Sequence, residues 1–435
     1  MIRLLALTAG LFIALAAPLR AEVSITPVTS DSGLQAWLVE ERSIPFVALE
    51  LIFAGGATLD GDATAGATSL MTALLSEGAG DMDAQAYAAR SEELAARISF
   101  DSGRDTVSVS VRFLTEDADD VIDHVRTALT DPRFDADAVE RVRGQMLSKL
   151  RRDALDPNTL ASQAFAQAAY GDHPYGRASD GSVDTVAALD VAALQAAHQG
   201  AIARDRVFIG AAGDIDAPEL ARLIDRLFDG IPQEGAPVPE RAEFSAPPGI
   251  AVIPFDGPQS VIAFGHDGIA RDDPDFLTAF VVNEVFGGGR FGTRLMESLR
   301  VQRGLTYGVG SFLASGLLGE SYQGRMSTDN ANAAAAIELL REEWAGIAQN
   351  GISADDLSRI QTYLTGAYPL RFDGNAAIAS TMASMQYQGF DIDYVNFRND
   401  LIDALTLDQV NAMAARLFDA DALHFVVVGQ PEGLE

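Results

Sequence analysis

Histidine is the side chain best suited to metal binding and proton transfer near neutral pH, and this chain has five. They are His124, His173, His198, His266 and His424, and no two lie within twenty residues of each other. A zinc site on one helix needs ligands at positions i and i+4, on the same face. The chain also has no cysteine, which excludes disulfides, thiolate zinc sites and cysteine nucleophiles. The sequence therefore predicts no local metal motif, and only a site assembled from distant residues stays open.

The glycine run GGGRFG at 287–292 formally matches the G-x-G-x-x-G pattern of dinucleotide-binding turns. That pattern requires a strand before it and an acidic residue about twenty positions later. The preceding stretch instead has Phe276, Phe280 and Val281 at helical spacing, and no acidic residue follows in the required place. We therefore expect the glycines to form a flexible break between two helices.

The next segment, RFGTRLMESLRVQRGLTYGVGSF at 290–312, contains the most informative pattern of polar residues. Phe291, Leu295 and Leu299 are spaced as one apolar stripe of a helix, which is expected to break at Gly304.

A strand is then expected to begin at Leu305, which places Arg300 at a helix end and Tyr307 at a strand start. A guanidinium offers several donors in a fixed geometry, and a phenol offers one hydroxyl, so this pair has the chemistry to hold the oxygen atoms of a substrate. The structural alternative is that Arg300 caps the helix and Tyr307 fills a core.

The scaffold for these residues divides at the proline-rich stretch 232–248, which lacks apolar periodicity and is expected to be a linker. The flanking halves, 22–231 and 249–435, run through similar orders of strands and helices. This repetition predicts an α+β fold made by tandem duplication. We expect strands at 35–40, 45–55, 105–114, 206–215, 249–255, 260–269 and 423–432, and helices near 117–129, 136–155, 218–228, 330–348, 353–367 and 374–388.

The order of these motifs resembles the C-terminal half of the insulinase-like (M16) zinc metallopeptidases. The matching features are the glycine-rich break, the helix ending in Leu299-Arg300, and the R-G-L-x-Y strand entry at 303–307. The turn His173-Pro174-Tyr175-Gly176 and the stretch FAGGA at 53–57 extend the resemblance over nearly the whole chain after residue 21. The resemblance implies two M16-like domains, each a mainly antiparallel sheet packed with helices. It also assigns substrate contact to Arg300 and Tyr307, and a structural role to His173.

The resemblance fails at the zinc site. The family carries H-x-x-E-H on the helix that matches GATSLMTALLSEG at 66–78, and the positions of His, Glu and His hold Ser69, Thr72 and Ala73. The family's distal Glu ligand falls near Ser148 and Lys149, and a lysine would repel a zinc ion. The first half is therefore expected to bind no metal.

The resemblance then implies a two-chain arrangement known in the family. This chain has no cofactor of its own, and an H-x-x-E-H partner subunit brings the zinc and forms a heterodimer with it. Together they would hydrolyse an unstructured peptide, with the Tyr307 hydroxyl and the Arg300 guanidinium supporting the reacting carbonyl. This chain alone is expected to be inactive. Two alternatives stay open, namely a non-enzymatic assembly subunit and a peptide-binding protein with the same fold.

The net charge and the N-terminal segment indicate what the protein can bind and where in the cell it is located. The formal net charge is −31, with Lys149 the only lysine, so binding to nucleic acid is not expected. The apolar run Leu4–Leu19 between Arg3 and Arg20-Ala21 is typical of a signal peptide covering 1–21, although an uncleaved anchor is the alternative. Cleavage would leave 29 basic and 62 acidic residues, a charge of −33, and no membrane segment. We therefore expect a periplasmic protein.

Overall fold

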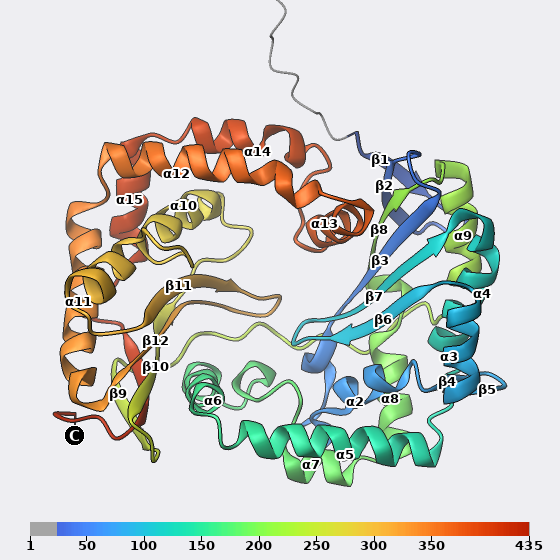
Figure 1. Cartoon of the computed structure of the whole chain (residues 1–435), viewed down its shortest axis with the longest axis horizontal. Coiled ribbons are helices and arrows are strands. Elements are labelled where there is room, and N and C mark those ends of the chain that lie inside the picture. The colour runs from blue at the N-terminus through green and yellow to red at the C-terminus, as the bar shows by residue number, and fades with distance from the viewer. Residues whose placement is uncertain (1–23, 435) are drawn as a thin grey trace, which may run out of the picture.

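The computed structural model describes residues 24–434, so the expected signal peptide at 1–21 lies outside the described residues. Two β-sheets stand on opposite sides of the molecule, one from each half of the chain (Figure 1). Helices connect the two sides above and below, which gives the chain the outline of a frame around two inner helices. Within residues 24–434, no helix has both the length and the apolar character needed to cross a bilayer.

The first sheet has six strands in the order β1-β2-β8-β3-β7-β6. Strands β2 and β8 are parallel, and the other neighbours are antiparallel. On β7, Val107, Val109 and Val111 are buried and alternate with polar residues, as a half-buried strand requires. The strands are β1 (Thr26–Thr29), β2 (Gln35–Glu40), β3 (Phe46–Ala54), β6 (Arg97–Ser102), β7 (Thr106–Leu114) and β8 (Val207–Gly213), beside a small hairpin of β4 (Gly78–Ala79) and β5 (Met82–Asp83).

The second sheet has five strands in the order β11-β12-β10-β13-β9, with β13 and β9 parallel. When β1 is set aside, the two strand orders correspond one to one. The tandem α+β duplication predicted from the sequence is therefore confirmed. The strands are β9 (Gly249–Pro254), β10 (Gln259–Asp267), β11 (Gly308–Ser315), β12 (Glu320–Asp329) and β13 (His424–Gly429).

Helices of the first half cover the outer face of its sheet. Helix α9 begins after Asp216, whose carboxylate accepts a hydrogen bond from the Glu219 amide at 2.9 Å, and it buries Leu220, Leu223 and Leu227. The helices are α2 (Ala67–Leu74), α3 (Ala84–Glu93), α4 (Ala118–Thr130), α5 (Ala136–Asp153), α6 (Pro157–Tyr170), α7 (Val183–Ala188), α8 (Val191–Ala201) and α9 (Ala217–Leu227).

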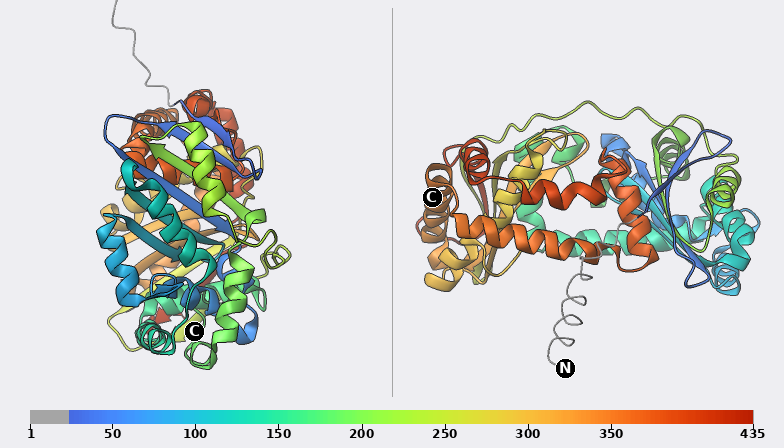
Figure 2. Two further views of the ribbon diagram at one scale, coloured as in Figure 1. Left: turned by 90° about the vertical axis from the view of Figure 1, so that its right-hand side faces the viewer. Right: turned by 90° about the horizontal axis from the view of Figure 1, so that it is seen from above.

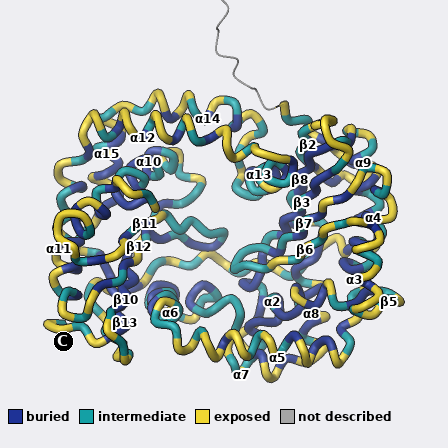
Figure 3. The backbone as a smooth tube through the Cα atoms, in the orientation of Figure 1, coloured by how far each residue is buried: buried dark blue, intermediate teal, exposed yellow. Residues whose placement is uncertain are grey.

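Helices of the second half form a second core around Trp344, which is fully buried and donates its indole N–H to His266 at 3.1 Å. Figure 3 shows that burial is concentrated on the sheets, while the outer faces of the helices are exposed. The helices are α10 (Phe276–Phe286), the π-helical segment η6 (Met296–Gln302), α11 (Ala333–Asn350), α12 (Ala354–Ala367), α13 (Asn375–Tyr387), α14 (Tyr394–Asp403) and α15 (Leu407–Leu417).

The two halves exchange one helix each, which the sequence did not predict. Helix α6 of the first half packs on the second sheet, where Phe165 lies among Val261 and Val426. Helix α13 of the second half packs on the first sheet, where Ala379 lies against Ala48 and other small residues. In Figure 1 these are the two inner helices. Each sheet therefore completes its inner face with a helix from the other half.

A tyrosine hydroxyl joins the tips of two hairpins, one from each sheet. Tyr175, in the short helix η4 (Pro174–Gly176), donates to Asp105 Oδ2 at 2.6 Å and accepts from the Leu318 amide at 2.9 Å. The Leu317 amide donates to the same carboxylate oxygen at 3.1 Å. Burial and the neighbouring Asp105 carboxylate raise the pKa of Tyr175, so the phenol stays neutral.

The stretch 232–248 contains no helix or strand, but it is held along its length. It runs along one edge of the molecule between the halves (Figure 2). The Ala242 amide donates to the Leu318 carbonyl at 2.6 Å, and the Ser245 amide donates to the Ala169 carbonyl at 2.8 Å. This connection is therefore packed against both halves rather than extended into solvent.

Gly210 on β8 makes the close packing of α13 possible. A Cβ atom at this position would lie 2.1 Å from the Ala379 carbonyl oxygen and 2.7 Å from the Ala383 amide nitrogen. We expect Gly210→Ala to lower the free energy of unfolding by about 1–3 kcal/mol, because backbone on both sides must move apart. Urea unfolding followed by circular dichroism measures this.

Gly144→Ala is the matched control, because Gly144 lies within α5 and a Cβ there meets no atom within 4 Å. This change should raise stability by about 0.5–1 kcal/mol, since alanine favours a helix. Equal stability of the Gly210→Ala variant and the unmodified chain would contradict the close approach of α13.

Candidate functional site

The helix that corresponds to the family's metal-binding helix is α2, and a buried carboxylate fixes its start. Asp60 accepts hydrogen bonds from the Gly66 amide at 3.0 Å, the Thr68 amide at 3.1 Å and the Thr68 hydroxyl at 2.6 Å. Burial raises the pKa of Asp60, while these hydrogen bonds oppose the rise. Leu70 and Leu74 face the core. The helix is thus held by capping and apolar burial, without a metal.

The three degenerate positions on α2 present no metal donor set. Ser69 is half-buried and donates to Asp180 Oδ1 at 3.0 Å. Thr72 is 1% exposed, and its hydroxyl has no hydrogen-bond partner among the described residues. Ala73 is exposed and has no donor atom. These residues do not fit a zinc ion, which requires imidazole or carboxylate ligands at such positions.

A lysine ammonium stands beside these positions. Lys149 Nζ donates to Asp180 Oδ2 and to Asp153 Oδ2, both at 2.8 Å, so Asp180 bridges Ser69 and Lys149. These two carboxylates raise the pKa of Lys149 and keep it charged. Ser148 turns away and donates to the Gly144 carbonyl at 2.7 Å. A fixed positive charge therefore occupies the neighbourhood in which the family binds a cation.

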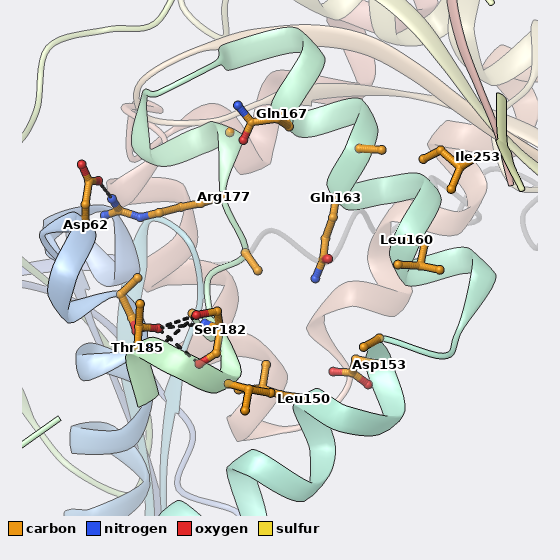
Figure 4. A pocket seen from close by; sticks show the side chains of 17 residues that line it. Asp62, Leu150, Asp153, Leu160, Gln163, Gln167, Arg177, Ser182, Thr185 and Ile253 are labelled. Carbon is orange, nitrogen blue, oxygen red and sulfur yellow. Dashed lines mark hydrogen bonds and ion pairs between the residues drawn. The ribbon is translucent and has the colours of Figure 1, made fainter. Parts of the chain in front are cut away.

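A cavity of about 640 Å³ adjoins this charged network, between α5, α6 and the start of α7 (Figure 4). Leu150 and Asp153 of α5 and Gln163 of α6 point toward it. Across the cavity, Arg177 forms an ion pair with Asp62 at 2.5 Å. Ser69, Thr72 and Ala73 are not among the residues that line this cavity, so it adjoins Asp153 of the charged network and not the degenerate positions themselves.

The five histidines are separate from one another and serve packing. Four have a ring nitrogen within 2.6–2.9 Å of a backbone carbonyl or a hydroxyl oxygen, and His266 also accepts from the Trp344 indole. The fifth lies 2.7 Å from the Pro247 carbonyl oxygen. Across residues 24–434, no group of three or more His, Cys, Asp or Glu side chains could hold a metal ion. The five histidines are His124, His173, His198, His266 and His424.

Arg300 lies near the end of η6, and its guanidinium stacks 4.6 Å from the centre of the Phe291 ring. The predicted apolar stripe is wrong at Phe291, which is 70% exposed, whereas Leu295 and Leu299 are buried. The reason is the backbone of Gly292, whose φ of +132° separates Phe291 from the helix that follows. Phe291 therefore supports the guanidinium instead of entering the core.

The Arg300 side chain has no hydrogen bond or salt bridge to any residue between 24 and 434. The helix end is closed by backbone groups, since the Gly304 amide donates to the Arg300 carbonyl at 3.1 Å and the Leu305 amide donates to the Leu299 carbonyl at 2.8 Å. The guanidinium donors are thus not used to cap the helix, and they are available to an incoming group.

Tyr307 is 71% exposed, so it does not fill a core. The predicted strand start is wrong by three residues, because β11 begins at Gly308. The buried Thr306 hydroxyl causes this delay: it donates to the Ser327 carbonyl at 2.6 Å and accepts from the Gly308 amide at 3.1 Å. Arg300 and Tyr307 therefore flank one turn, without a contact between their side chains within the described chain.

No sequence pattern indicated which residues contact Ser69, Lys149 and Arg300 in the folded chain. Asp180 belongs to no motif, and only its position between Ser69 and Lys149 in space gives it a role. The stacking of Arg300 on Phe291 was also not predictable from the sequence, because the helical spacing favoured a buried Phe291. Lys149, the only lysine of the chain, was the one compositional hint.

Comparisons with known proteins agree with this geometry. Residues 37–181 match the family model for insulinase (peptidase family M16), and residues 188–364 match the model for the peptidase M16 inactive domain. The fold is similar to the crystal structure of a peptidase M16 inactive domain from Pseudomonas fluorescens, with a TM-score of 0.88 and 28% identity over 95% of this chain and 100% of that chain. A protease from Helicobacter pylori shares the fold, with a TM-score of 0.84 at 14% identity over 93% of this chain and 99% of that chain.

Two sequence relatives bear contrasting names. The non-peptidase homolog YmxG of Helicobacter pylori is 24% identical over 398 residues, which cover 89% of this chain and 90% of the relative. An uncharacterized zinc protease of Streptomyces coelicolor is 25% identical over 360 residues, which cover 80% of this chain and 77% of the relative. Both family models fall within one family, and their matches at 37–181 and 188–364 together cover most of the chain. The chain therefore belongs to the insulinase (M16) peptidase family.

Proposed function

We propose that this chain is the non-catalytic subunit of a periplasmic M16 peptidase, and that it supplies Arg300 and Tyr307 to a zinc-bearing H-x-x-E-H partner. The relatives of this chain include a non-peptidase homolog and an inactive M16 domain, which supports the interpretation that this chain is an inactive M16-type protein. One observation carries the proposal: the metal ligands are replaced at α2, while the half-buried Arg300 and the exposed Tyr307 have no hydrogen-bond or ion-pair partner among residues 24–434.

The chemistry of the two side chains fits a supporting role in peptide hydrolysis. In the proposed complex, the Tyr307 hydroxyl donates to an oxygen of the bound peptide, and the Arg300 guanidinium, oriented by Phe291, adds donors nearby. The partner contributes the zinc chemistry. Phe291, Val301 and Tyr307 also leave apolar surface exposed around Arg300, which favours a second chain or a peptide at this place.

The first prediction concerns the metal. The purified chain should contain no stoichiometric zinc and cleave no unstructured peptide. The variant Ser69→His, Thr72→Glu, Ala73→His should also stay metal-free, because the Lys149 ammonium remains beside these positions and no distal carboxylate ligand is supplied. Elemental analysis after dialysis measures the metal content. One tightly held zinc per unmodified chain would overturn this prediction.

The second prediction concerns assembly. Mixed at micromolar concentration with an H-x-x-E-H chain of the same family from the same organism, this chain should elute as a heterodimer in size-exclusion chromatography with light scattering. Each chain alone should lack peptidase activity or show far less than the mixture. Two separate monomers in the mixture would count against the proposed subunit role, and assembly without any gain in activity would favour the non-enzymatic alternative.

The third prediction concerns Tyr307. Tyr307→Phe removes one hydroxyl from an exposed side chain, so folding and assembly should not change, while kcat/KM of the complex should fall about 100-fold or more. Tyr363→Phe is the matched control, because Tyr363 is also an exposed tyrosine of the second half. Full activity of the Tyr307→Phe complex on several peptides would show that the hydroxyl takes no part in turnover.

A further inference from the structure

A cavity of about 920 Å³ lies in the second half, between α10 and β11 on one side and α13 and α14 on the other. In Figure 1 this is the region between the second sheet and the inner helix α13, beneath α12 and α14. Its volume falls in the range of small-molecule and peptide-end sites in proteins. The glycines Gly288 and Gly289, which precede the Arg300 segment, form part of its wall.

Three arginines line this cavity, namely Arg271, Arg371 and Arg398. Arg398 is only 7% exposed, stacks 4.3 Å from the Tyr368 ring centre, and donates to the Leu364 carbonyl and the Asn399 side chain. Arg271 stacks 4.4 Å from the Phe276 ring centre.

None of these three arginines forms a salt bridge with a carboxylate of residues 24–434. Burial lowers the pKa of Arg271 and of Arg398. In a chain of net charge −31, guanidiniums without an ion-pair partner are unexpected, because burying an unpaired charge costs free energy.

The acidic residues of the cavity wall are already paired with other arginines. Asp273 and Asp275 both bind Arg416, at 2.5 Å and 3.0 Å. Glu284 binds Arg290 at 3.4 Å. The three carboxylates of the wall are thus held by Arg290 and Arg416, which leaves Arg271, Arg371 and Arg398 without an ion-pair partner among residues 24–434.

The three arginines and Tyr394 line the same cavity. Each guanidinium lies close enough to Tyr394 to oppose the rise of its pKa that burial causes. Tyr394 stacks on Phe390 with ring centres 4.3 Å apart. The cavity thus combines cationic donors with aromatic and apolar wall surface, including Phe276 and Phe280.

We infer that this cavity binds the carboxylate of a peptide end that also carries an apolar side chain, with the carboxylate held by Arg271, Arg371 and Arg398 and the apolar group against the aromatic wall. A guanidinium presents parallel donors that match a carboxylate, and a hydrogen bond between two charged groups is stronger than one between neutral groups. The inference deepens the proposed function, on which its choice of a peptide ligand rests, and it assigns the subunit a ligand that it binds without the partner.

Binding is tested on the purified chain alone, by calorimetry at low salt. The probes are the tripeptide acid acetyl-Ala-Leu-Phe, its C-terminal amide and inorganic phosphate. The acid should bind, and the amide and phosphate should bind at least tenfold more weakly. Equal binding of acid and amide, or no binding of the acid, would overturn the inference. Phosphate binding as tight as that of the acid would overturn the contribution of the apolar wall.

The informative variant is Arg371→Gln, because Arg371 is exposed and its removal leaves the fold intact. It should weaken binding of the acid at least tenfold, and Arg271→Gln should act in the same direction. Arg359→Gln changes the net charge equally on an exposed part of α12 outside the cavity, so it should leave binding unchanged. Equal loss in Arg359→Gln and Arg371→Gln would show that only overall charge matters, which would overturn the site.

This test is independent of assembly. If the chain binds the peptide acid but forms no heterodimer, the result supports the carboxylate site in the cavity and contradicts the proposed subunit role. If the heterodimer is active but the acid does not bind, the subunit role stands and the cavity inference falls.

Discussion

The burial of two inner sheet faces under exchanged helices is the constraint on which this structure depends. The first sheet presents small residues such as Ala48, Gly210 and Ala212, and only a backbone that approaches closely, that of α13, can cover them. The second sheet presents larger residues, and Phe165 of α6 fills the space between them. Apolar burial of this kind scales with the area removed from water, so neither half can complete its core without the other. The arginine-lined cavity depends on this arrangement, because α13 forms part of its wall.

The same constraint explains how the fold persists without the family's metal. Helix α2 is anchored by the Asp60 carboxylate and by leucines in the core, and neither contact involves a ligand position. The partly exposed network of Ser69, Asp180 and Lys149 adds little stability, since partly exposed ion pairs contribute at most about 1 kcal/mol. Loss of the ligands therefore changes the chemistry of this face and leaves its architecture in place.

Local patterns predicted local structure well. Alternating valines indicated β7, helical spacing indicated α4 and α11 to α13, and the repeated order of elements indicated the duplication. The loss of metal ligands was also visible, because it depends on residue types alone. The exchange of α6 and α13 was not visible, since an apolar helix face does not specify which sheet it covers. The arginine-lined cavity could not be predicted for a similar reason, because Arg271, Arg371 and Arg398 come from separate elements that only folding brings together.

The exchanged helices also hold the two halves of the chain together independently of the linker. A cut within 232–248 would separate the chain into two fragments, each of which keeps a helix seated on the sheet of the other. The hydrogen bonds from the Leu318 amide to Tyr175 and from the Leu317 amide to Asp105 join the same two fragments at a second place. A nicked molecule would consequently stay associated as a non-covalent pair, and its integrity on a native column would conceal a break that a denaturing gel reveals. In this protein, covalent continuity and structural continuity are separate properties.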